Sequence, residues 1–513
     1  MNVPATIHAP GAERARPVPR ADRDAAHAAR IGRSVTLRLA SQAAAALINV
    51  AAMVLLGRTL SARGYGEYAF YYSFIPLIGS AGDLGVGIVI TREMARDRSR
   101  AARLLGDAIL IKAALAGLIL IVALATGWAL FDPTRAALIT LLAATALIDV
   151  GQDPSVWALR AHERLDLEAL LLVLSQVVWF TLLAAAVWLG AGLLALLGAA
   201  TVAFAVRLVV GAVIVARRLH RPEFRLEPRR LSTLLACGLP FGAAMATVVL
   251  YGRIGVLMLG ALATATDVAC FNVGYLLSQP FGFVASAVTL GAFPRLAQRA
   301  RGATEALRRD LRRTLHYVLV AALPLSLGLA LLAPALIEML FHGRGFERSA
   351  VALRALCPAL PLIFLNLAAR YALAALDRQA SYLRAVIVGL TVNVALCFAL
   401  IPFHGFMGAC IAYVAAELAT WVVCQRALLD LVSPAELLRD AMKPLLATAG
   451  MAALVLALHG APPALVVVVG GVAYPVLLRL LGGITDDELR ILGRVVMEPR
   501  LVPPAVGPME RRP

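Results

Sequence analysis

Long apolar runs are the feature that most limits what this chain can fold into. A helix needs about 20 mostly apolar residues to cross the hydrocarbon core of a bilayer, and the 513-residue sequence contains fourteen such runs. They are rich in Ala and Leu and lack the two-residue alternation of strands, so we expect helices, which satisfy their own backbone hydrogen bonds in lipid. The expected spans are 34–56, 67–91, 104–130, 136–159, 167–189, 193–216, 232–260, 268–293, 314–341, 350–375, 381–401, 405–428, 439–459 and 462–482.

Composition agrees with a membrane protein. Hydrophobic residues make up 61% of the chain, charged residues only 15%, and the mean hydropathy is +0.82. A typical soluble domain is about 25% charged, so a water-soluble globular fold is disfavoured, and disorder, collagen and a disulfide scaffold are excluded. The six cysteines all fall inside expected spans and form no CxxC pair, so we interpret them as small buried apolar side chains.

The net charge of +17 fits either a nucleic-acid-binding protein or a membrane protein. Most basic residues lie outside the apolar runs, which favours the membrane and predicts no nucleic-acid partner. With the N-terminus placed inside, the inner segments hold 36 Lys and Arg residues, the outer loops 5 and the spans 7. The positive-inside rule therefore predicts a multi-pass protein of the bacterial cytoplasmic (inner) membrane with both termini in the cytoplasm.

Loops and weak internal repeats predict two halves. Matches at an offset of about 204 residues pair Leu56-Gly57 with Leu259-Gly260, Pro76 with Pro280, and Pro154 with Pro358. Six helices per half bring both halves into the membrane from the same side, so the repeat is parallel. The expected parts are a disordered cytoplasmic tail (1–33), an N-terminal lobe (34–216), a basic cytoplasmic linker (217–231), a C-terminal lobe (232–430), an extra helix pair (431–482) and a cytoplasmic tail (483–513).

Four stretches carry a resemblance to a known family. They are LGRTLSARGYGEYAFYYSF (56–74), DLGVGIVITREMAR (83–96), RAHERLDLEAL (160–170) and YGRIGVLMLGALATATDVACFNVGYLLSQP (251–280). Together they resemble the polysaccharide-biosynthesis, O-antigen-flippase-like branch of the multidrug/oligosaccharidyl-lipid/polysaccharide exporter superfamily. The resemblance covers most of residues 34–430. One departure is visible, because members often have an acidic residue two positions after the Arg of the last stretch, whereas Gly255 follows Arg253 here.

The resemblance implies an all-α polytopic fold of about fourteen helices, with two six-helix lobes around a central cavity and two C-terminal helices. It also implies a flippase, which moves an oligosaccharide linked to polyprenyl pyrophosphate from the inner to the outer leaflet by alternating access. Such a protein serves cell-surface lipopolysaccharide or exopolysaccharide biosynthesis. Its expected partners are the lipid-linked oligosaccharide, the bilayer, a polysaccharide polymerase and glycosyltransferases.

Charged residues deep inside the N-terminal spans are candidate substrate contacts. A charge at mid-bilayer costs at least about 2.5–3.5 kcal/mol, so each needs a reason. Asp149 and Asp153 lie one helical turn apart, on the same helix face, with Gln152 beside them. Lys112 and Arg207 lie within other spans of the same lobe. Two hypotheses remain: a paired network that holds the first bundle together, or a polar cavity wall that contacts pyrophosphate and sugar hydroxyls.

In the second half, Arg253 and Glu417 have no obvious partner nearby in the sequence. We expect Arg253 to contact the phosphates of the substrate. Glu417 is a candidate proton-titrating residue, with a structural role as the alternative. Four amide side chains could face the sugar: Asn272, Gln279, Asn366 and Asn393.

Signatures of covalent chemistry are missing from the sequence. The only lysines are Lys112 and Lys443, and neither follows a glycine, so there is no GxxxxGK[ST] phosphate loop. HExxH, CxxC and GxSxG are also absent. We therefore predict no enzyme, no cofactor and no metal, with transport driven by an ion or membrane potential, a substrate gradient or downstream enzymes.

Three alternatives stay open beside the oligosaccharide flippase. A peptidoglycan-precursor (lipid II) flippase shares the fold and helix number. A cation-coupled multidrug or metabolite antiporter of the same superfamily usually has twelve helices, and the extra pair argues against it. A polytopic glycan polymerase or glycosyltransferase would usually need a sizeable outer loop, whereas the outer loops here are short.

Overall fold

The computed structural model describes residues 20–130, 132–300, 304–458 and 462–483, and within these ranges the chain is helical and contains no strand. The first half comprises α1 (Arg20–Thr59), α2 (Ala62–Asp83), α3 (Val86–Arg96), η1 (Arg98–Arg100), α4 (Ala101–Leu130), α5 (Pro133–Gly151), α6 (Asp153–Ala161), α7 (Leu165–Trp188) and α8 (Leu193–Arg218). The second half comprises α9 (Pro228–Leu262), α10 (Ala265–Ser278), η2 (Gln279–Phe281), α11 (Gly282–Arg299), α12 (Thr304–Phe341), α13 (Glu347–Leu356), α14 (Ala359–Ala375), α15 (Gln379–His404), α16 (Phe406–Arg426), α17 (Pro434–Ala457) and α18 (Pro463–Leu480). The predicted all-α fold is confirmed.

Twelve helical segments of the described chain are long and apolar enough to cross a membrane, or thirteen if the bent pair of α13 and α14 forms one span. Each predicted run coincides with one helix or with consecutive helices. The predicted run 67–91 is not among the segments that are long and apolar enough to cross a membrane. It consists of α2 and α3. This segment is rich in Tyr and packs against α5, α9 and α10, so protein rather than lipid covers much of it. The chain is therefore a multi-pass membrane protein close to the expected helix number.

Several predicted spans are broken within the membrane. Between α2 and α3, Leu84 and Gly85 both adopt positive φ, at 44° and 68°. The α13–α14 pair is bent by 43°. Pro154 and Pro358, which the repeat pairs at an offset of 204 residues, each lie at such a break, α5–α6 and α13–α14. Proline favours a break at these positions because it has no N–H to donate to the carbonyl of the preceding helical turn.

The N-terminal segment differs from the prediction. Helix α1 begins at Arg20, so the expectation that residues 1–33 are disordered is wrong for residues 20–33. This stretch is rich in Ala and Arg, which favour helix, and it continues into the apolar part of α1 without a break. Residues 1–19 lie outside the described residues, as do residues 484–513 of the predicted C-terminal tail.

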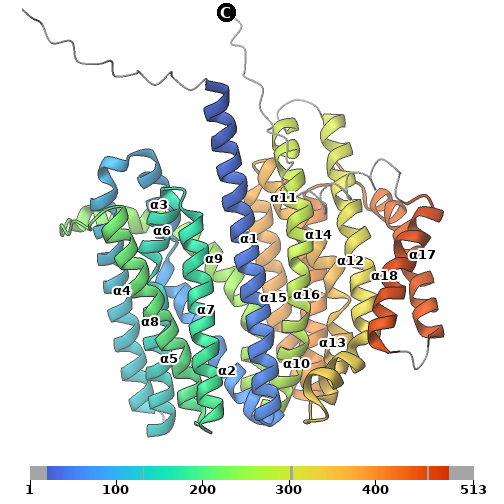
Figure 1. Ribbon diagram of the computed structural model, residues 1–513, viewed down its shortest axis with the longest axis horizontal. Helices are drawn as coiled ribbons and strands as arrows, with labels where there is room; N and C mark the ends of the chain where they lie inside the picture. The colour runs from blue at the N-terminus through green and yellow to red at the C-terminus, as the bar shows by residue number, and fades with distance from the viewer. Residues whose placement is uncertain (1–19, 131, 301–303, 459–461, 484–513) are drawn as a thin grey trace, which may run out of the picture.

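Figure 1 shows how the helices are arranged. Helix α1 begins and α18 ends at the same side of the molecule, which we call the terminal face, and we call the other side the opposite face. Helices α4, α5 and α8 lie at one edge and α17 and α18 at the other, with α1 and α15 between them. The helices of the two predicted lobes therefore gather side by side, and the extra pair flanks the second lobe.

Helix α9 connects the lobes. Its first part packs on α3, where Gly238 and Gly242 lie against the turn at Gly85. A Cβ on Gly85 would lie 2.2 Å from the backbone N of Gly242, so both the close approach and the positive φ require glycine. Helix α9 also packs on α2 and on α15 of the C-terminal lobe. The predicted boundary at residue 232 therefore divides the sequence at a helix that contacts both lobes.

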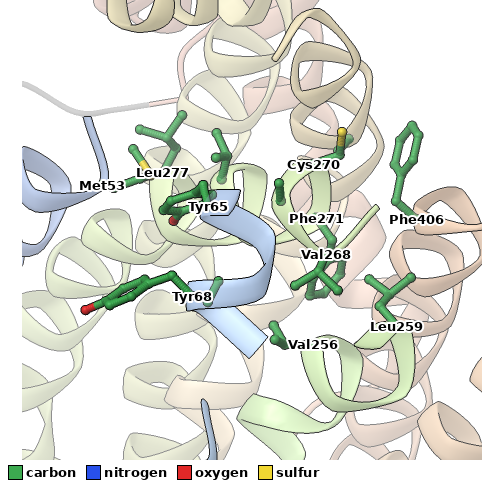
Figure 2. Packing of buried hydrophobic residues seen from close by; sticks show 14 of the residues in the cluster. Met53, Tyr65, Tyr68, Val256, Leu259, Val268, Cys270, Phe271, Leu277 and Phe406 are labelled. Atoms are coloured by element: carbon green, nitrogen blue, oxygen red, sulfur yellow. The ribbon is translucent and has the colours of Figure 1, made fainter. Parts of the chain in front are cut away.

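The buried hydrophobic residues form one cluster that is shared by the two lobes and others that belong to a single lobe. One cluster of buried residues joins both lobes, and Figure 2 shows its members Met53 and Tyr65 from the N-terminal lobe with Val268 and Phe271 from the C-terminal lobe. Two further clusters are separate, one built around α3, α4 and α6 and the other around α12, α14 and α16. The lobes therefore share a core in one part of the molecule and have cores of their own elsewhere.

Contacts at the opposite face hold the lobes together. Asn272 Nδ2 donates to the hydroxyl of Tyr65 over 2.8 Å, and both side chains are buried. A Cβ on Gly66 would lie 1.7 Å from the carbonyl oxygen of Ala265, so the backbones of α2 and α10 touch there. Arg58 Nε donates to the carbonyl of Leu340 at the end of α12. The two lobes are thus in direct contact at the opposite face.

The extra helix pair is attached to α12. Arg308 pairs with Glu436 at 2.7 Å, and Arg312 makes a two-pronged contact with Asp440. The hydroxyl of Tyr474 on α18 donates to the carbonyl of Val320 over 2.7 Å. The pair is therefore fixed to the C-terminal lobe by ion pairs near the terminal face and by a hydrogen bond further along α12.

Candidate substrate-binding site

Lys112 is the centre of a polar cluster in the N-terminal lobe. Only 3% of its side chain is exposed. Its Nζ donates to the carbonyl of Gly82 over 3.0 Å, to Asp83 over 3.1 Å and to Asp153 over 2.8 Å. The ammonium also lies 4.8 Å from the ring centroid of Trp157. Two carboxylates, a carbonyl and an aromatic face therefore compensate one buried cation.

Asp149 and Arg207 extend this cluster. The amide of Gln152 donates to Asp149. Arg207 on α8 interacts electrostatically with Asp149 and Asp153. Gln152 Oε1 and Arg207 Nε are buried and have no hydrogen-bond partner in the described part of the chain. The five residues predicted from the first half are thus brought together, with two polar atoms left for another partner.

A second polar cluster surrounds Glu417 in the C-terminal lobe. The Glu417 side chain on α16 is buried. Asn366 Nδ2 on α14 donates to its carboxylate over 2.7 Å and to its backbone carbonyl over 3.0 Å. The hydroxyls of Tyr251 and Tyr413 also lie beside the carboxylate. No basic side chain forms an ion pair with Glu417 among the residues that the structure describes.

Arg253 lies between the two clusters. It is half-buried on α9 and interacts electrostatically with Tyr72 of the N-terminal lobe and Tyr275 of the C-terminal lobe. Tyr72 also interacts electrostatically with Asp149. The ring of Tyr275 packs edge-on against that of Tyr413, with the ring centroids 5.6 Å apart. A row of polar groups therefore runs from one cluster to the other, and within the described residues no carboxylate pairs with Arg253.

The other amide candidates lie elsewhere. Asn272 is committed to the contact with Tyr65 between the lobes. Gln279 is exposed at the break between α10 and α11. Asn393 is buried on α15, where its Oδ1 accepts from the thiol of Cys397. These three predicted contacts are not brought to the Lys112 or Glu417 clusters.

Sequence reasoning missed several members of the site. Asp83 and Trp157 complete the surroundings of Lys112, and four tyrosines, Tyr72, Tyr251, Tyr275 and Tyr413, form the row between the clusters. One signal was present, because Tyr413 precedes Glu417 by one helical turn. Tyrosine inside a span is itself informative, since a buried hydroxyl needs a hydrogen-bond partner.

The arrangement suits the binding of a polar ligand. It offers guanidinium, phenol and amide groups, which fit phosphate and sugar hydroxyls. No group of three or more His, Cys, Asp or Glu side chains is placed to hold a metal ion within the described residues. A separate apolar pocket of about 310 Å³ lies between α12, α14, α16 and α17, and none of the predicted site residues line it.

The fold of this chain is similar to that of solved membrane transporters. Its structure is similar to one titled lipid II flippase MurJ, inward closed conformation, with a TM-score of 0.73 and 12% identity over 90% of this chain and all of that chain. It is also similar to a multidrug resistance MATE family transporter of the MOP superfamily. The inward-facing form gives a TM-score of 0.62, with 17% identity over 75% of this chain and 95% of that one. The outward-facing form gives 0.56, with 19% identity over 77% and 93%.

Sequence comparison then places the chain in a family. The family model described as polysaccharide biosynthesis protein matches residues 31–299, and the MatE model matches residues 240–399. The chain belongs to the polysaccharide biosynthesis protein family, as the four sequence stretches predicted. A search of curated protein sequences found no significant match.

Proposed function

We propose that this protein moves an oligosaccharide linked to polyprenyl pyrophosphate across the bacterial cytoplasmic membrane by alternating access, for the synthesis of a cell-surface polysaccharide. It acts as a carrier without catalysis. Family membership and the fold support this class of function. A polysaccharide polymerase and glycosyltransferases are its proposed partners, which would consume and supply the substrate.

Arg253 is the observation that carries the proposal. Its guanidinium lies between the lobes, among tyrosines, with no carboxylate paired to it within the described residues. An uncompensated cation inside a membrane protein is costly and marks a substrate path. A guanidinium offers a planar fork of donors that matches phosphate, and a pyrophosphate supplies the missing negative charge. The tyrosine hydroxyls on both sides can hydrogen-bond to the first sugars.

Packing supports the alternation of access. The lobes meet at the opposite face through Asn272 and Tyr65, whereas two separate hydrophobic clusters serve the individual lobes. We propose that the terminal face is cytoplasmic, because the loops there carry most of the Lys and Arg residues. The form described here then has its external side closed, as expected of a carrier ready to take substrate from the inner leaflet.

Arginine variants test the proposal in a strain whose surface glycan depends on this protein. Arg253→Ala and Arg207→Ala are expected to reduce export at least about tenfold, because each removes a cation available to phosphate. Arg253→Lys keeps the charge but not the fork and should fall between. The control is Arg63→Ala, which removes an exposed partner of Glu67. Protein level and glycan are measured together, and normal export in both Ala variants would overturn the site.

A lipid II flippase is the second candidate, because the structural similarity to MurJ extends over 90% of this chain and all of that one. It uses the same pyrophosphate-binding chemistry with a different sugar. Complementation separates the two: growth of a strain depleted of its lipid II flippase would favour this candidate. Restored surface polysaccharide without rescued growth would favour the first.

A further inference from the structure

Two histidines from separate helix ends meet near the terminal face, away from the site above. His162 follows α6, and His220 follows α8 at the start of the linker to α9. Their Nε2 atoms are 3.2 Å apart. The ring centroids are 5.1 Å apart and the ring planes are inclined by 53°. The two rings therefore do not stack but direct the same nitrogen of each ring toward a common region.

The hydrogen bond on the far side of His162 determines its tautomer. Its Nδ1 lies 2.9 Å from the carbonyl oxygen of Ala158. A carbonyl only accepts, so Nδ1 carries the proton and Nε2 of the neutral ring presents a lone pair. Histidines that bind metals usually have this arrangement, with the outer nitrogen donating to a carbonyl or a carboxylate.

The distance between the Nε2 atoms fits two ligands of one metal ion. Zinc binds imidazole nitrogen at about 2.0–2.1 Å. Two such bonds to nitrogens 3.2 Å apart enclose an angle of about 100°, close to tetrahedral.

Backbone hydrogen bonds hold both histidines in place. The backbone N–H of His162 donates to the carbonyl of Ala158 over 3.1 Å, and that of His220 donates to Val215 over 3.1 Å. Both side chains are half-buried, which leaves room for water at the remaining coordination positions.

We propose that His162 and His220 form a two-histidine site for a divalent transition-metal ion of the Zn²⁺, Ni²⁺ or Cu²⁺ type, with water completing its coordination. Imidazole nitrogen is a preferred ligand of these ions. The bound ion links the end of α6 to the linker that leads into α9. Because α9 contacts both lobes, such a link ties the first lobe to the helix that joins it to the second.

Metal titration of the full-length protein tests the site. The protein is purified without a polyhistidine tag, and Zn²⁺ binding is followed by calorimetry and Cu²⁺ binding by electron paramagnetic resonance, which detects nitrogen ligands. The wild type is expected to bind one ion more per chain than the His162→Ala or His220→Ala variant, or to bind at least about tenfold more tightly. The control His404→Ala, at the end of α15, should behave as the wild type.

A second measurement needs no variant and so does not depend on mutant folding. Zn²⁺ should protect His162 and His220 of the wild type from carbethoxylation by diethylpyrocarbonate, read by peptide mass spectrometry, while His404 stays equally reactive. Equal metal uptake by the wild type and by both the His162→Ala and His220→Ala variants would overturn the proposal. So would modification of the two histidines at the same rate with and without Zn²⁺.

Discussion

The polar cluster of the N-terminal lobe contains three carboxylates and two cations, whereas that of the C-terminal lobe contains a single carboxylate. Around Lys112, opposite charges meet at hydrogen-bonding distance. Glu417 instead receives hydrogen bonds from an amide and has phenol groups beside it, so its charge is solvated by dipoles but not neutralised. The first arrangement holds charges against one another, and the second leaves a charge that can respond to a proton or a ligand.

This difference assigns different roles to the two clusters. Of the two early hypotheses for the first half, the paired network describes Lys112, Asp83 and Asp153, whose charges are already used. We propose that Arg207, whose Nε has no partner within the described residues, belongs to the cavity wall.

Lys112→Met should produce the largest change in stability. It leaves Asp83 and Asp153 without their cation, and breaking a buried ion pair from one side costs about 3–5 kcal/mol. We expect a large loss of folded protein and a lower unfolding temperature in detergent, read by fluorescence size-exclusion chromatography. The matched control is Lys443→Met, since this exposed lysine makes one contact, to the carbonyl of Gly482.

A double variant sharpens this prediction. Lys112→Met combined with Asp153→Asn removes a charge of each sign and should recover part of the lost stability. If the single Lys112→Met variant were as stable as the wild type, the ion pairs would not support the lobe and the cluster would have to be assigned to substrate binding.

Glu417→Gln should have a smaller effect on stability and a clear effect on transport. Glutamine keeps the shape and can still accept from Asn366, so the cost is about 1 kcal/mol, the size of one hydrogen bond. Transport should fall at least about tenfold if the negative charge takes part in the cycle. The exposed Glu338→Gln on α12 is the control. Unchanged glycan export in Glu417→Gln would leave this residue a structural role alone.

Tyr72→Phe should have the smallest effect on transport. The variant removes only the hydroxyl between Arg253 and Asp149 and keeps the ring that packs on Trp179. We expect stability to change by about 0.5–1.5 kcal/mol and transport to fall severalfold, measured in the same glycan assay. The neighbouring Tyr71→Phe serves as the control, and an equal loss in both variants would show that the row between the clusters is not specific.

Local sequence patterns predicted the spans and one of the two clusters. Hydropathy depends on a window of neighbouring residues, so the fourteen runs could be recognised without any tertiary contact. Asp149 and Asp153 could be paired because helical geometry places them on one face. Lys112 and Arg207 could be added because buried charges of opposite sign need each other.

The contacts between distant helices could not be predicted in this way. Asn272 was expected to face the sugar, yet it bonds to Tyr65, which is 207 residues away. The choice depends on how α2 and α10 are rotated and how closely Gly66 lets them approach. The same holds for His162 and His220, whose rings meet only because the ends of two helices lie together.

The sequence by itself determined that this chain crosses a membrane many times, where the apolar parts of its helices lie along the chain, and which family it belongs to. These properties depend on the transfer of apolar segments into lipid and on short motifs, both of which are local. The tertiary structure decided which polar side chains pair with one another and which have no partner among the described residues. These pairings depend on helix rotation and packing, which bring Asp83 and Asp153 to Lys112 and, among the described residues, no carboxylate to Arg253.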